Sequence, residues 1–65
     1  MNWDQVEGSW KQVMGKAQAK WGDITEQDWH STQGRREQIV GLVQKKYGHA
    51  KEAAEREVDE WIGKV

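Results

Sequence analysis

The chain has 65 residues and a net charge of −1, which is enough chain for one domain with a thin core. Only 35% of the residues are hydrophobic and the mean hydropathy is −1.08, so five Trp residues must supply much of the buried apolar surface. The chain has no Cys, which excludes disulfides, and no apolar run longer than two residues, so we expect one cytoplasmic domain over residues 1–65 without a membrane span.

The first predicted helix runs from about Trp3 to Trp21. Asn2 is a good N-cap, and Gln5 stands at the position that completes a capping box. Apolar residues then recur at steps of three and four, which is the spacing of one buried stripe on a helix. We expect this helix to end at Gly22, because glycine readily takes the left-handed conformation that follows many helices.

A short second helix is predicted from Glu26 to about Ser31. Thr25 and Asp28 form a second capping box before it, and the acidic side chains suit the positive end of the helix dipole. Polar residues and a glycine follow this segment, which indicates a break before the next helix.

The third predicted helix runs from about Gly34 to Tyr47 and stops at Gly48, and the fourth runs from about Ala50 to Gly63. Both carry apolar residues at steps of three and four. The prediction is therefore an all-α fold of four helices, in which the first two and the last two form helical hairpins.

An internal repeat relates the first helix to the third. A shift of 26 positions places residues 8–22 on residues 34–48, with six identical residues in this segment. The matched pairs are Gly8 with Gly34, Gln12 with Gln38, Gly15 with Gly41, Gln18 with Gln44, Lys20 with Lys46 and Gly22 with Gly48. A repeat of this length indicates an internally duplicated fold, built from two copies of one small unit.

Two of the repeated glycines lie on the polar side of their helices. On a helical wheel, Gly15 and Gly41 fall opposite the apolar stripes. A glycine inside a helix costs about 1 kcal/mol relative to alanine, so we expect the first and third helices to cross closely at these positions. The alternative is that this face stays open for a partner. The candidate interaction surface then consists of Lys11, Gln12, Gly15, Gln18, Arg35, Arg36, Gln38, Gly41, Gln44 and Lys45.

Charge is segmented along the chain. Residues 23–34 sum to −3 and residues 35–48 sum to +3, so we expect these segments to complement each other. Arg35 and Arg36 oppose the dipole at a helix N-terminus, and we expect them to pair with acids of the preceding segment. Those acids are Asp23, Glu26 and Asp28. Nucleic-acid binding by basic residues of the first and third helices is an alternative that the net charge does not favour.

No group of residues has the spacing of a catalytic or cofactor site. His30 and His49 are the two imidazoles and stand in different connections, whereas a closed metal site needs about four ligands. Gly15 and Lys16 lack the spacing and the following Ser or Thr of a phosphate loop. We therefore expect no catalysis, no metal and no cofactor.

Several short motifs combine over nearly the whole chain. They are Trp10-Lys11-Gln12, Gly15-Lys16, Trp21-Gly22-Asp23-Ile24-Thr25, Asp28, residues 34–41, Gln44, Tyr47-Gly48 and residues 51–58. In this combination the chain resembles the CsbD-like family of small bacterial general stress proteins. The resemblance implies a four-helix domain of two roughly orthogonal hairpins, similar to SAM-domain-like folds. It also implies expression under general or osmotic stress, and it implies no catalytic residues.

These observations favour a non-enzymatic stress-response protein that acts through a binding surface or by protective abundance. The glycine content and low hydropathy also resemble hydrophilins, the protective proteins of water stress. The alternatives are a nucleic-acid-binding helical module and a small protein-interaction or dimerisation domain. The partner expected in the last case is another protein or a second copy of the chain, and no membrane is expected.

Overall fold

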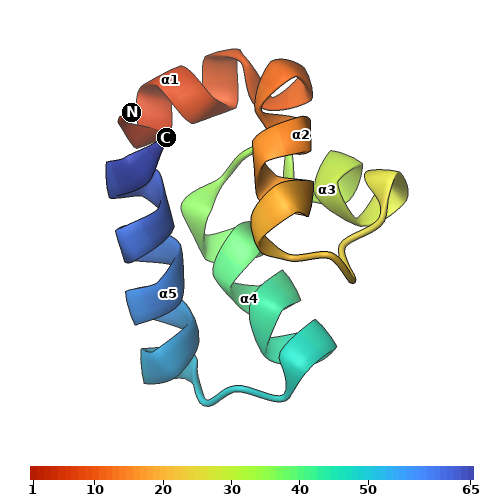
Figure 1. The fold of residues 1–65 in the computed structure, drawn as a ribbon, viewed down its shortest axis with the longest axis vertical. Helices are drawn as coiled ribbons and strands as arrows, with labels where there is room; N and C mark the ends of the chain where they lie inside the picture. The colour runs from red at the N-terminus through yellow and green to blue at the C-terminus, as the bar shows by residue number, and fades with distance from the viewer.

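Two short helices replace the single helix predicted at the N-terminus. In the computed structural model, which describes residues 1–65, α1 spans Trp3–Gly8 and α2 spans Trp10–Lys20 (Figure 1). The capping box of Asn2 and Gln5 is confirmed. The break falls at Ser9 (φ −130°, ψ 28°), directly after Gly8. Glycine and serine are weak helix formers, and pairs of them are a common cause of helix kinks, so one continuous helix was the wrong prediction.

The end of α2 also differs from the prediction. Gly22 does not take the left-handed conformation, and the helix ends because Trp21 leaves the helical region (φ −120°, ψ 88°). The Trp21 indole N–H donates to Glu57 Oε1 at 2.6 Å, and the backbone N–H of Asp23 donates to Tyr47 Oη at 3.1 Å. The chain after α2 is therefore held by long-range hydrogen bonds to the C-terminal half.

The third helix, α3, spans Glu26–Thr32, and its capping box of Thr25 and Asp28 is confirmed. Gln33 and Gly34 follow with positive φ values of 51° and 75°. These left-handed residues reverse the chain, so the next helix begins two residues later than predicted.

The C-terminal half is a helical hairpin. Helix α4 spans Arg36–Tyr47, and Gly48 ends it in the left-handed conformation as predicted (φ 68°). Helix α5 spans Lys51–Lys64 and runs back along α4 to the N-terminus of the chain (Figure 1). The all-α class is confirmed, with five helices in place of four and 77% of the residues helical. The likeness to SAM-domain-like folds stays a prediction.

Tryptophans dominate the core. The Trp61 ring lies 5.2 Å from that of Trp21 and 6.1 Å from that of Trp29, centre to centre, and both partners are fully buried. Trp29 is anchored by its indole N–H, which donates to the carbonyl of Trp10 at 2.6 Å. Twelve apolar residues form the buried core, and they come from every helix and from the α2–α3 connection: Val6, Val13, Ala17, Trp21, Ile24, Trp29, Ile39, Val40, Val43, Ala54, Val58 and Trp61.

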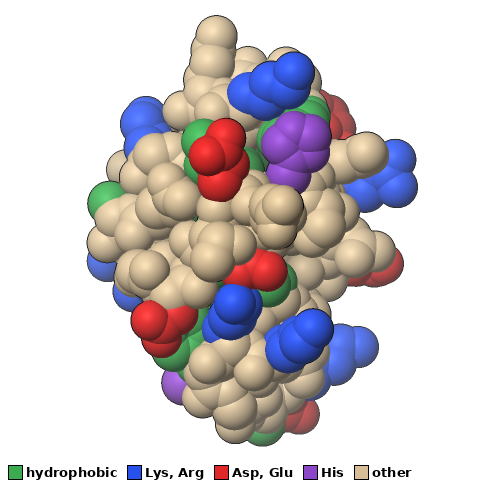
Figure 2. Space-filling model, turned by 90° about the vertical axis from the view of Figure 1, so that its right-hand side faces the viewer, with side chains coloured by type: hydrophobic (Ala, Val, Ile, Leu, Met, Phe, Trp, Pro, Cys, Tyr) green, Lys and Arg blue, Asp and Glu red, His purple; other side chains and the backbone are tan.

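The surface is polar. Met1 is the one large hydrophobic residue that is exposed, at 42%. Figure 2 shows one face on which basic and acidic side chains alternate and hydrophobic atoms appear only in small areas. No helix combines the length and the apolar character needed to cross a membrane.

Candidate interaction surface

Gly15 and Gly41 are exposed, and neither lies at a helix crossing. A Cβ atom added at either position would meet nothing within 4 Å outside its own helix. The predicted close crossing of the first and third helices is therefore wrong. Both glycines are instead open to solvent, and the alternative that this face is kept open for a partner stays a prediction.

The topology explains why the crossing does not form. Helix α4 packs against α5 on one side and α3 on the other, whereas α2 packs against α1 and α3. Helices α2 and α4 are thus not close neighbours, although they carry the repeated sequence. The glycine that does permit a close approach is Gly34, where an added Cβ would lie 2.8 Å from both Trp10 Cβ and the Val6 carbonyl oxygen.

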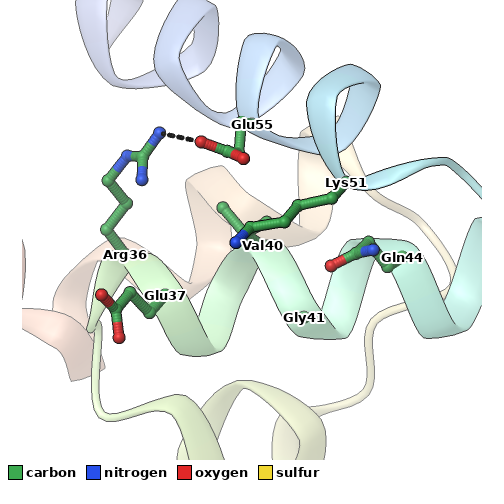
Figure 3. A pocket seen from close by; sticks show the side chains of 7 residues that line it. All are labelled: Arg36, Glu37, Val40, Gly41, Gln44, Lys51 and Glu55. Carbon is green, nitrogen blue, oxygen red and sulfur yellow. Dashed lines mark hydrogen bonds and ion pairs between the residues drawn. The ribbon is translucent and has the colours of Figure 1, made fainter.

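A shallow groove of about 400 Å³ runs between α4 and α5 and contains three of the candidate residues (Figure 3). Its lining comprises Arg36, Glu37, Val40, Gly41, Gln44, Lys51 and Glu55. The side chain of Lys51 extends from α5 across the buried Val40, and the bare backbone at Gly41 leaves the groove open beside Gln44. Lys51 and Glu55 were not predicted, because the repeat pattern highlights α4 and does not reach α5.

Two further hollows flank Trp10, which is half-buried. One, of about 290 Å³, is lined by Trp10, Lys11, Met14, Glu26 and His30. The other, of about 270 Å³, is lined by residues 8–12 at the α1–α2 break. The His30 ring meets the Trp10 ring edge-on at 4.6 Å, and Lys11 Nζ lies 5.6 Å from the centre of the Trp10 ring.

The candidate residues are thus divided between separate surfaces. Lys11 and Gln12 lie at the start of α2, where they line the hollows beside Trp10. Arg36, Gly41 and Gln44 lie in the groove on α4. The remaining members line no hollow, and they are Gly15, Gln18, Arg35, Gln38 and Lys45. No hollow contains residues of both helices.

Arg36 holds α4 and α5 together, which corrects its predicted pairing. Its Nε and Nη2 donate to the two carboxylate oxygens of Asp59 at 2.9 and 3.0 Å, and Nη2 also donates to Glu55 at 3.3 Å. The hydrogen bonds from Arg36 lower the pKa of Asp59, and the same bonds raise the pKa of the guanidinium. A fork-shaped pair of this kind is stronger than an ordinary surface ion pair.

Arg35 also pairs outside the predicted set, with Glu7 at 3.7 Å. The acids 23–28 lie at the start of α3, next to the end of α4, so Asp28 meets Lys46 Nζ at 2.7 Å. This is the one ion pair between the two oppositely charged segments, so their predicted complementarity is confirmed only at Asp28 and Lys46.

Acid is expected to weaken the fold through Asp28. Its pKa is lowered from 3.8 to about 2, first by the hydrogen bond from Lys46 and then by those from Thr25. A carboxylate with a lowered pKa contributes stability that is complete above about pH 4 and is lost as the pH falls toward 2. We expect Asp28→Asn to be less stable than the parent at pH 7 and the difference to shrink as the pH falls to about 2, measured by thermal melts across this range. A difference that stays constant across the range would contradict this role.

No group of three or more His, Asp or Glu residues is arranged to hold a metal ion. His49 Nε2 lies 3.3 Å from Glu57, and the His49 ring stacks on Tyr47. His30 packs against Trp10. Both imidazoles therefore have packing partners within the fold.

Several known proteins are similar to this chain over most of its length. A UPF0337 protein of Rhodopirellula baltica is 67% identical over 61 residues, which cover 94% of this chain and 90% of that protein. A UPF0337 protein of Rhizobium meliloti is 55% identical over 64 residues, which cover 98% of this chain and 93% of that protein. The UPF0337 protein YjbJ of Escherichia coli is 46% identical over 61 residues, covering 94% and 88%. No solved structure matches the chain.

The family model described as CsbD-like matches residues 4–56, which include all ten residues of the candidate interaction surface. This match and the relatives agree with the resemblance carried by the short motifs. The chain belongs to the CsbD-like family of general stress proteins.

Proposed function

We propose that the chain is a non-enzymatic stress-response protein of the cytoplasm, which protects other macromolecules through its abundance when water is withdrawn. The observation that carries this proposal is the polar surface, on which Met1 alone among large hydrophobic residues is exposed. A protein without an exposed apolar patch lacks the kind of surface through which most proteins associate. At high concentration it separates other proteins that would aggregate.

The nucleic-acid alternative is weaker on α4, whereas Lys11, Lys16 and Lys20 of α2 have no carboxylate within 4 Å. Of the basic residues around α4, Arg35, Arg36 and Lys46 are each within 4 Å of a carboxylate. Paired cations offer less net positive charge to a phosphate backbone. Lys45 is the member of this cluster that has no such pair.

Docking of a protein partner is the second candidate function. It is favoured by the open backbone at Gly41, in the groove between α4 and α5, where no side chain blocks the approach of another molecule. A bare helical backbone permits closer contact than any other residue type allows.

One drying experiment tests both candidates. A drying-sensitive enzyme is dried and rehydrated with increasing amounts of this protein, of Gly41→Leu, or of an inert protein at equal mass. Gly41 has open space around it, so the Leu variant is expected to fold. Protection that increases with added mass and is equal for both forms supports protective abundance.

Protection that saturates near one molecule per enzyme, and that Gly41→Leu loses, supports docking instead. Recovery of activity no better than with the inert protein contradicts both candidates.

A further inference from the structure

At several positions the fold lacks a stabilising contribution that a single substitution would supply. Gly15 lies inside α2 and Gly41 inside α4, both exposed and both without a neighbour that an added Cβ would touch. Close packing, the usual reason to keep glycine in a helix, is therefore absent at both positions. Each glycine nevertheless disfavours its helix by about fivefold in the folding equilibrium relative to alanine.

A second, independent observation is that three helices lack a side-chain cap at their N-termini. Helices α1 and α3 have full capping boxes, whereas α2, α4 and α5 have no side-chain cap at all. Their N-cap residues are Ser9, Arg35 and Ala50. Ser9 could cap but does not, and alanine offers no acceptor, so these starts lack a contribution that the other two helices have.

The third observation is an unsatisfied hydrogen-bond donor in the core. The indole N–H of Trp61 is buried and has no hydrogen-bond partner, whereas those of Trp21 and Trp29 are both satisfied. A buried donor without a partner loses its hydration and gains nothing in return. The core is otherwise continuous, so the weaknesses lie mainly in the helices that it must hold together.

From these three observations we infer that the folded fraction of this domain is set by water activity. A chain of 65 residues has little stability to spare, and the uncapped, glycine-interrupted helices leave it within about 2 kcal/mol of its unfolding midpoint in dilute solution. Excluded solutes favour the state that exposes less surface, so the helices become fully formed when solutes accumulate or water is withdrawn. An equilibrium near its midpoint responds most steeply to such a change.

This inference goes beyond the protective role proposed above and does not rest on it, because it concerns the folding equilibrium alone. The test follows helix content by far-UV circular dichroism in dilute buffer at about 37 °C and in about 1 M sucrose. We expect more than about one molecule in twenty to be unfolded in buffer, and fewer in sucrose.

Two variants determine whether the glycines set this balance. Gly15→Ala with Gly41→Ala is expected to raise the folding equilibrium constant roughly twentyfold and to remove most of the response to sucrose. The matched control is Ala19→Gly, a reversed change at an exposed position of α2, which should lower the constant about fivefold. The inference is overturned if fewer than about one parent molecule in twenty is unfolded in buffer, or if the double variant folds no better than the parent.

Discussion

Replacement of Gly34 by alanine is expected to lower the free energy of unfolding by about 3 kcal/mol or more, which would leave the chain largely unfolded in dilute buffer. Two effects add at this residue. Its φ of 75° is unfavourable for any residue with a Cβ, and that Cβ would stand 2.8 Å from Trp10 Cβ and from the Val6 carbonyl oxygen. Neither neighbour can move easily, since one is a main-chain atom and the other is the first side-chain atom of Trp10, whose main-chain carbonyl accepts the hydrogen bond from Trp29.

Gly48→Ala is the matched control for this prediction. Gly48 has a similar φ of 68°, but an added Cβ would meet nothing within 4 Å. It should cost only the backbone strain, about 1 kcal/mol. Refolding in increasing sucrose, followed by far-UV circular dichroism, compares the two variants, and Gly34→Ala should need much more sucrose than Gly48→Ala to regain helix. Equal losses for the two variants would show that the close approach of Gly34 to α1 and α2 contributes nothing.

This comparison also shows how far the internal repeat can be taken. Gly34 is matched in the repeat by Gly8, yet Gly8 is open to solvent and ends α1. Gly48 is matched by Gly22, yet only Gly48 is left-handed. Residues that are matched in the two halves of the repeat therefore occupy different structural environments. The repeat predicts similar helices correctly, but it does not predict identical surroundings for them.

Local features of the fold were predictable because they depend on few neighbouring residues. The capping boxes at Asn2 and Thr25 are confirmed, since each needs only two side chains three residues apart. The buried stripes are largely confirmed for the same reason, as they follow the helical period. The break at Ser9 was not predicted, because the spacing of apolar residues continues through Ser9 although the helical backbone conformation is interrupted there.

The surroundings of the candidate interaction surface depend on topology, which the helical wheel does not contain. The wheel placed Gly15 and Gly41 correctly on the polar side of their helices. It could not say whether another helix would cover them, and the predicted cover is absent. The pairing of Arg36 shows the same limit, because its partners on α5 are nineteen and twenty-three residues away in the sequence.

Trp29→Phe is expected to lower the free energy of unfolding by about 2–4 kcal/mol. The change removes part of a fully buried ring, and it removes the indole N–H that donates to the Trp10 carbonyl at 2.6 Å. That hydrogen bond joins α3 to the start of α2, so its loss should also loosen the half-buried Trp10. Tryptophan fluorescence during urea unfolding, again in sucrose, measures both the stability and the environment of the remaining rings.

Trp61→Phe separates the hydrogen bond from the packing. The Trp61 ring meets that of Trp29 edge-on at 6.1 Å in the same core, but its indole N–H has no partner. The same substitution there loses a similar part of the ring without breaking a hydrogen bond, and it relieves an unsatisfied donor. We expect it to cost about 1–2 kcal/mol less than Trp29→Phe. If the two substitutions are equally destabilising, packing alone accounts for the tryptophan core, and the link from Trp29 to Trp10 does not help to hold α2 against α3.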